Sequence, residues 1–173
     1  MVNLLGKPGA YLHRSANGID ESPVVPFHEQ KSISTENTFQ QDTTDLTLLN
    51  SELVRMTEKI AFQLRCDNRL TGCVSVKIRY TDFETHNIQK SIDHSNQDHV
   101  LLTTVKELFT KLYTRRILIR LIGIRFTNLI PGNYQINLFK DTQEKIKMYR
   151  AIDSIKNTYG ERFILKAAGI SHK

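Results

Sequence analysis

Alternating hydroxyl and cationic residues are the first chemical signal in this sequence. Ser75, Lys77, Arg79 and Thr81 occupy every second position, and apolar or aromatic residues stand between them. Successive side chains of a β-strand point to opposite faces, so this period of two places all four residues on one face. Hydroxyls and cations are groups that bind phosphate oxygens. The segment therefore predicts a strand with one polar face that could hold a sugar–phosphate chain.

The same alternation returns further along the chain. Arg125 and Thr127 alternate with apolar residues in a second candidate strand. Arg120 has the opposite parity, so we expect a β-bulge near Gly123 to turn it to the polar face. An earlier candidate strand contributes the remaining members of the set: Lys31, Ser32 and Ser34.

The distribution of charge supports a polyanionic partner. The formal net charge is +6, and no acidic residue lies between Glu107 and Asp141. The cations of that stretch are Lys111, Arg115, Arg116, Arg120, Arg125 and Lys140. A patch of one sign costs self-repulsion, which a nucleic acid would relieve. The alternative is that these cations only protect a sheet against pairing with another strand. Contacts to the backbone alone would make DNA affinity independent of sequence and strongly dependent on salt.

Neither metal binding nor catalysis is predicted. The six histidines show no metal-ligand spacing with one another or with Cys66 and Cys73. We expect the two cysteines to be reduced thiols. Glu36, Glu52 and Asp93 are interpreted as acids of a turn, a helix surface and a loop, respectively.

Hydrophobic periodicity predicts the elements that would position these residues. Apolar residues at steps of three and four predict one helix over about 46–64, with N-cap chemistry at Asp42–Asp45. A second helix is predicted to follow Asp98, which would be its N-cap. Strands are expected over about 31–35, 74–81, 85–92 and 117–129. A last helix over 143–159 should bury the stripe formed by Met148, Ile152, Ile155 and Tyr159.

This order predicts an α+β fold of the β-α-β-β-α-β type. Both amphipathic helices must bury their stripes, and the apolar side of the four-stranded sheet is the large partner available. The two helices should therefore cover one face and leave the other open. Residues 1–20 would be the helical end of an upstream domain, and 21–30, with Pro23 and Pro26, a linker. Residues 31–130 would form the central domain and 131–173 a C-terminal extension with a helix.

Bulk properties favour a soluble, cytoplasmic, monomeric protein. Apolar residues make up 39% of the chain and charged residues 24%, as in globular proteins. No window approaches the roughly 18 apolar residues that a membrane span needs. The first residues lack a signal-peptide pattern.

Four segments, in the right order, resemble Y-family translesion DNA polymerases of the DNA polymerase IV type. Residues 6–12 (GKPGAYL), with 18–20, resemble the end of the thumb domain. The next three resemble the little-finger domain: 31–39 (KSISTENTF) its opening, 76–83 (VKIRYTDF) its second strand and turn, and 120–129 (RLIGIRFTNL) its last strand. The resemblance covers nearly the whole chain.

The resemblance implies a DNA-binding part of an error-prone polymerase that acts in DNA repair and damage tolerance. The little finger tracks the backbone of template–primer DNA. The expected DNA-binding residues are Lys31, Ser32, Ser34, Ser75, Lys77, Arg79, Arg120, Arg125 and Thr127. Gln30 stands where relatives often have another cation. The parent enzyme would be a DNA-directed DNA polymerase, a nucleotidyltransferase with two Mg²⁺ ions on palm carboxylates. We expect the palm to lie outside this chain, which then contains no catalytic residue and no cofactor.

The segment Gln135–Phe139 resembles the sliding-clamp-binding pentapeptide of bacterial polymerases. Gln135 would be a polar anchor, and Ile136, Leu138 and Phe139 would fill a hydrophobic pocket of the clamp. Equally, the three apolar residues could pack against the sheet or the last helix of this chain.

Two other functions remain open at this point. The β-α-β-β-α-β order also occurs in RNA-binding modules, which stack bases on exposed aromatic residues of the sheet. Tyr80 and Phe126 fall on the buried parity, which argues against that reading. The other alternative is a protein-interaction domain that uses residues 135–139 as a ligand for a partner groove.

Overall fold

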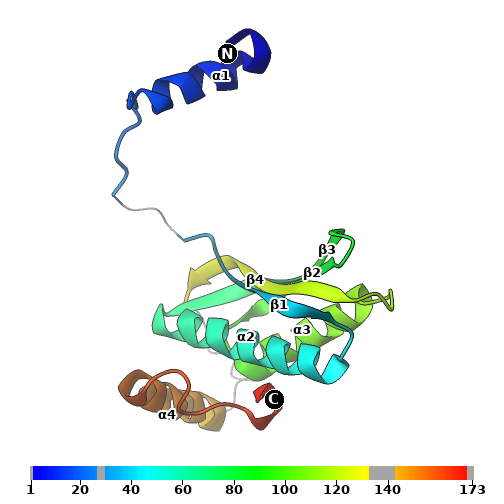
Figure 1. Ribbon diagram of the computed structural model, residues 1–173. Coiled ribbons are helices and arrows are strands. Elements are labelled where there is room, and N and C mark those ends of the chain that lie inside the picture. Colours follow the sequence, from blue (N-terminus) through cyan, green and yellow to red (C-terminus); the bar gives the residue numbers. More distant parts are fainter. Residues whose placement is uncertain (1, 27–29, 133–142, 171–173) are drawn as a thin grey trace.

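The computed structural model describes residues 2–26, 30–132 and 143–170, with side chains from residue 6 onward. The elements along the chain (Figure 1) are α1 (Val2–Ala16), β1 (Ser32–Thr43), α2 (Leu46–Cys66), β2 (Arg69–Tyr80), β3 (Thr85–Ser95), α3 (Asp98–Leu112), β4 (Ile119–Pro131), α4 (Gln143–Tyr159) and the short 3₁₀-helix η1 (Ala167–Gly169).

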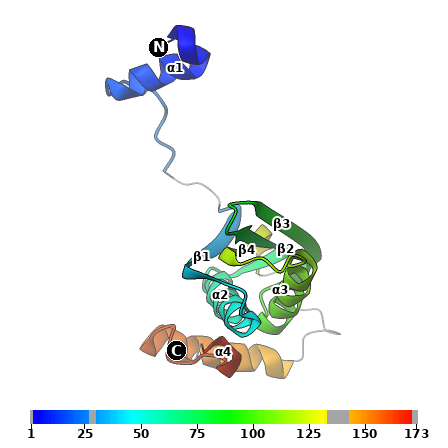
Figure 2. The same cartoon turned by 45° about the vertical axis from the view of Figure 1, so that its right-hand side comes forward.

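The four strands form one sheet in the order β1-β4-β2-β3, and neighbouring strands are antiparallel. β1 and β2 therefore run parallel on either side of β4, and α2 connects them. α3 makes the corresponding connection from β3 to β4. Figure 2 shows α2 and α3 side by side beneath the sheet, and no helix of the described residues packs on its opposite face. The predicted α+β fold, with two helices on one face, is confirmed.

The core lies between the sheet and these two helices. On β2, the alternating residues Val74, Val76, Ile78 and Tyr80 are all at most 1% exposed. They pack with Ile122, Ile124 and Phe126 of β4 and with the apolar stripes of α2 and α3. Burial of each such side chain contributes roughly 1.5–3 kcal/mol. This one-sided core fixes which residues of every strand point away from the helices.

The helix caps confirm one prediction and correct another. Asp45 is the N-cap of α2, and its carboxylate accepts hydrogen bonds from the Thr47 and Leu48 amides. The N-cap of α3 is Gln97, so the prediction that Asp98 caps this helix is wrong. Asp98 lies in the first turn, where its buried carboxylate pairs with Arg65 of α2. Asp98 therefore connects α3 to α2 instead of capping α3.

β1 is longer than the sequence predicted. It extends to Thr43 rather than ending near residue 35, and its second half is polar. No apolar alternation marks residues 36–43, so period-two reasoning could not detect this part of the strand. Main-chain pairing with β4 positions it instead. The extension changes Glu36 from the predicted turn acid into a residue of the sheet.

α4 packs against the helices, beneath α2 and α3 and away from the sheet (Figures 1 and 2). The predicted stripe was wrong at both ends, because Met148 is 48% exposed and Tyr159 67% exposed. The buried residues are Tyr149 and Lys156. A bidentate ion pair between Asp153 and Arg65 holds the same helix face. The contact is largely polar, so apolar periodicity selected the wrong face.

α1 stands apart from the sheet and the other helices in both views (Figures 1 and 2). Its helix is kinked at Gly6, and Gly18 follows its end with a positive φ of 71°, a conformation that glycine adopts without a Cβ penalty. Among the described residues, no helix combines the length and apolarity that a bilayer crossing requires.

Candidate nucleic-acid interface

The strand register aligns the side chains of the helix-free face into four rows that cross the sheet. Cross-strand partners point to the same face, so each row contains one residue from each of β1, β4, β2 and β3. The rows are Ser32–Thr127–Cys73–Ser91, Ser34–Arg125–Ser75–Gln89, Glu36–Gly123–Lys77–Asn87 and Thr38–Leu121–Arg79–Thr85. We call this surface the open face. Most of its residues carry hydroxyls, amides or one of three cations, and the exceptions are Glu36, Cys73, Leu121 and Gly123.

The three cations occupy successive rows. Arg125, Lys77 and Arg79 lie in the second, third and fourth rows, and neighbouring rows are about 7 Å apart, two residues along a strand. Hydroxyls of neighbouring strands orient the two arginines. Arg125 donates from Nη2 to Ser32 Oγ at 3.0 Å, and Arg79 donates from Nε to Thr85 Oγ1 at 2.9 Å. The guanidinium groups are therefore held along the surface with donors still free for a ligand.

Lys77 is paired with an acid of the same face. Its Nζ lies 2.9 Å from Oε1 and 3.1 Å from Oε2 of Glu36. Glu36 belongs to β1 and Lys77 to β2, so the ion pair spans β4 at Gly123. Glu36 was not predicted to belong to this face, because its position in the sequence suggested the acid of a turn. Only the register of β1 with β4 reveals that it faces Lys77.

Most of the residues predicted to bind DNA share this face. Seven of them lie on it: Ser32, Ser34, Ser75, Lys77, Arg79, Arg125 and Thr127. Lys31 precedes β1 and is exposed. The main-chain carbonyl of Gln30 accepts a 2.7 Å hydrogen bond from Arg69. Thr81 lies beyond the end of β2 and donates to Asp42 Oδ2 at 2.8 Å.

Arg120 is placed differently from the expectation. The predicted irregularity near Gly123 is wrong, because the register is regular there. The shift falls between the pairs Arg79↔Leu121 and Tyr80↔Ile119, which makes Arg120 the extra residue. Its guanidinium lies 4.9 Å from the centre of the Phe83 ring, at the β2–β3 turn. The same guanidinium lies 4.0 Å from Asp42 Oδ1, so Arg120 stands beside an acid at the end of the sheet rather than within the rows.

Aromatic stacking groups are missing from the rows of the open face. Tyr80 is 1% exposed and Phe126 is fully buried, on the helix side of the sheet. No row contains Phe, Tyr or Trp. A surface that reads single-stranded RNA places aromatic side chains in these positions. The composition instead suits contacts to phosphate and sugar.

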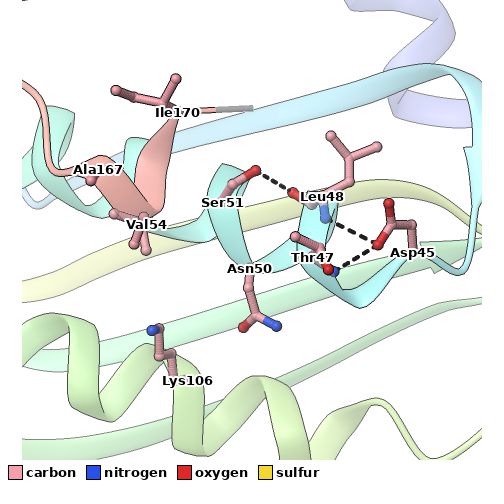
Figure 3. Close-up of a pocket in the computed structure, with 10 residues that line it drawn as sticks. Asp45, Thr47, Leu48, Asn50, Ser51, Val54, Lys106, Ala167 and Ile170 are labelled. Atoms are coloured by element: carbon pink, nitrogen blue, oxygen red, sulfur yellow. Dashed lines mark hydrogen bonds between the residues drawn. The ribbon is translucent and has the colours of Figure 1, made fainter. Parts of the chain in front are cut away.

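A groove of ≈ 700 Å³ lies on the other side of the molecule, between the start of α2, Lys106 of α3 and the η1 segment (Figure 3). Several of its polar groups make hydrogen bonds within the protein. Asp45 caps α2, and Ser51 donates to the Leu48 carbonyl at 2.8 Å.

The described residues provide no site for a catalytic metal. No group of three or more His, Cys, Asp or Glu side chains within them could hold an ion. Glu52 pairs with Arg55 on α2, and Asp93 belongs to β3, so its interpretation as a loop acid was wrong. Cys66 and Cys73 are free thiols.

Comparison with known proteins identifies the family. The family model described as impB/mucB/samB family C-terminal domain matches residues 30–138. DNA polymerase IV of Dehalococcoides mccartyi is 34% identical over 158 residues, which cover 90% of this chain and 40% of that protein. DNA polymerase IV of Clostridium kluyveri is 30% identical, with coverage of 95% and 44%, and that of Methanoculleus marisnigri is 33% identical, with 76% and 37%. The chain thus spans less than half the length of these relatives. It belongs to the impB/mucB/samB C-terminal domain family, the C-terminal domain of the Y-family DNA polymerases that its sequence resembles.

Proposed function

We propose that this chain binds the sugar–phosphate backbone of template–primer DNA through its open face, as the little-finger part of a translesion polymerase. One observation carries the proposal: Arg125, Lys77 and Arg79 stand in successive rows of a sheet face that is otherwise lined mainly with hydroxyls and amides. Such donors hold phosphates without reading base edges. Binding is therefore independent of sequence.

The decisive test removes the three cations together. We expect K77A/R79A/R125A to lose at least tenfold in affinity for duplex DNA in fluorescence anisotropy at 100 mM salt. The log–log salt slope should become shallower, by up to about 0.9 for each phosphate contact that is lost. A matched control, K59A/K106A/R150A, removes the same charge from exposed positions of α2, α3 and α4. If both triple variants bind alike, the open face is not the interface.

A competition separates this function from RNA binding. Duplex DNA and single-stranded RNA of equal length are titrated under the same salt conditions. Tighter binding of the RNA would favour an RNA-binding module, which the buried positions of Tyr80 and Phe126 argue against. No binding of either nucleic acid would favour a protein-interaction domain.

The proposed division of the chain follows from this role. Residues 1–20 are the end of the thumb, 21–30 the linker, 31–130 the little finger and 131–173 an extension. The family match over 30–138 and the sheet elements from Ser32 to Pro131 support this division. Chemistry belongs to the whole enzyme, a cytoplasmic DNA polymerase with Mg²⁺ held by palm carboxylates outside this chain.

Clamp binding by Gln135–Phe139 is a separate proposal. These residues lie outside the described residues, so the support is the sequence pattern alone. Replacing Leu138 and Phe139 with Ala should abolish affinity for a bacterial sliding clamp in surface plasmon resonance, with an unchanged melting temperature. Retained clamp affinity would favour packing of the segment on its own domain.

A further inference from the structure

Glu36 is the acidic member of the open-face rows, and it contacts Lys77, the middle one of the three cations. Both of its carboxylate oxygens contact Lys77 Nζ, at 2.9 and 3.1 Å. The two side chains remain 44% and 31% exposed, so water and ligands reach the pair. Carboxylate oxygens on a lysine reproduce the contact that phosphate oxygens would make.

The sheet is built to allow this contact. β1 and β2 are separated by β4, and the residue between Glu36 and Lys77 is Gly123. A Cβ on Gly123 would lie 2.7 Å from Glu36 Cγ, closer than atoms can approach. Only glycine leaves the space across which the carboxylate reaches. The fold hardly needs the pair, because both outer strands bond directly to β4 and an exposed ion pair contributes little to stability.

We propose that Glu36 is a built-in competitor of DNA: it occupies Lys77 in the free protein and is displaced by a backbone phosphate. The inference rests on the proposed function of the open face. Binding then exchanges one anion for another at Lys77, so this cation contributes less net affinity than Arg79 or Arg125. When a phosphate leaves, the carboxylate returns at once. Such an exchange lowers the affinity for DNA and lets the duplex slide across the sheet.

Removal of the competing charge provides the test. We expect Glu36→Gln to lower the Kd for duplex DNA about two- to fivefold at 100 mM salt, the range that an exposed ion pair is worth. The log–log salt slope should also steepen by about 0.9. In the unmodified protein the displaced Glu36 carboxylate retains a cation beside the phosphates, and a glutamine at this position cannot do so. Glu52→Gln is the control, since Glu52 is likewise paired with a cation, Arg55, but lies on α2.

A double-mutant cycle separates direct competition from general repulsion. In a Lys77→Met background, Glu36→Gln should change the DNA affinity by less than about 1.5-fold, because the contested cation is gone. An equal gain in both backgrounds would mean that Glu36 only repels DNA at long range, and would overturn the inference. An unchanged Kd for Glu36→Gln, or an equal gain from Glu52→Gln, would also overturn it. If the unmodified protein binds no duplex DNA, the proposed function itself fails.

Discussion

Arg65 connects three helices through a single guanidinium group. It makes a bidentate contact with Asp153 of α4, binds Asp98 of α3, and donates to the Asn96 carbonyl at 2.9 Å. Its side chain is only 10% exposed. Burial disfavours the charged form, but the hydrogen bonds to Asp153 and the Asp98 charge hold the pKa of Arg65 above its usual value. The residue is therefore a fixed positive charge inside the helical layer.

Replacement of Arg65 should be among the most damaging single changes. Arg65→Ala leaves two largely buried carboxylates, those of Asp98 and Asp153, without their shared partner. Loss of one member of a buried pair typically costs about 3–5 kcal/mol. We expect a loss of that size in urea unfolding, and Arg65→Lys should recover only part of it because an ammonium cannot make the bidentate contact. A loss below about 1 kcal/mol would mean that water replaces the guanidinium.

Glu58 gives the stability a specific dependence on pH. Burial raises the pKa of its carboxyl, and the charges of Lys156 and Lys166 offset only part of the rise. The folded protein thus keeps a proton that the unfolded chain has already released. Stability is therefore lost as the pH rises from the ordinary glutamate value through the raised pKa, and Glu58→Gln removes this loss.

The comparison of two pH values tests this assignment. We subtract the free energy of unfolding of Glu58→Gln from that of the unmodified protein. This difference should be larger, that is more positive, at pH 4 than at pH 7. Urea unfolding of both proteins at each pH gives the four values needed. The opposite order would mean that the ion pairs with Lys156 and Lys166 outweigh burial, and that the pKa is lowered rather than raised.

At the scale of elements, the sequence predicted those that bury apolar residues at a regular period. Apolar and polar residues alternate regularly from Val74 to Tyr80. This alternation predicted which side chains of β2 face the helices and which, including Lys77 and Arg79, face away from them. The stripes of α2 and α3 were equally clear. Polar contacts between elements could not be predicted in this way. The second half of β1 and the docked face of α4 depend on main-chain pairing and on ion pairs between residues far apart in the chain.

The same limit explains the errors within the candidate site. Gly123 suggested a bulge because glycine often marks one in a strand. Its role in the structure is to leave space for Glu36. The bulge lies instead at Arg120, a position that no local signal marks. Both features depend on how three strands align, and that alignment follows from the register of the sheet rather than from any one segment.

The attachment of α4 can be weakened without disturbing the sheet. Asp153→Asn removes a charge that accepts two hydrogen bonds from Arg65, which are worth about 1.5–3 kcal/mol each when one partner is charged. We expect the α4 amides to exchange with deuterium at least tenfold faster, while the amides of β2 and β4 keep their protection. Ser154→Ala, at an exposed position of the same helix, serves as the control. Equal acceleration in the sheet would mean that α4 and the sheet unfold as one unit.

At the scale of the whole molecule, the two layers differ in what they offer to partners. The helical layer places its charges in pairs that connect α2, α3 and α4, such as Arg65 with Asp98 and Asp153. On the sheet, Arg79 and Arg125 donate to the hydroxyls of Thr85 and Ser32, respectively. A net charge of +6 is therefore less informative than its placement.

Removal of residues 1–30 tests whether this surface works independently of α1. The buried cluster begins at Ile33 and ends at Phe126, and α1 stands apart from it in both views of the fold. The shortened chain should therefore melt within about 2 °C of the full chain in calorimetry, because it loses no core contact. Its affinity for duplex DNA should stay within about twofold, since Lys77, Arg79 and Arg125 are all retained. A large fall in melting temperature would mean that α1 packs on the sheet in solution. A large fall in affinity at constant stability would mean instead that Lys7 or Arg14 of the removed segment also holds the DNA backbone.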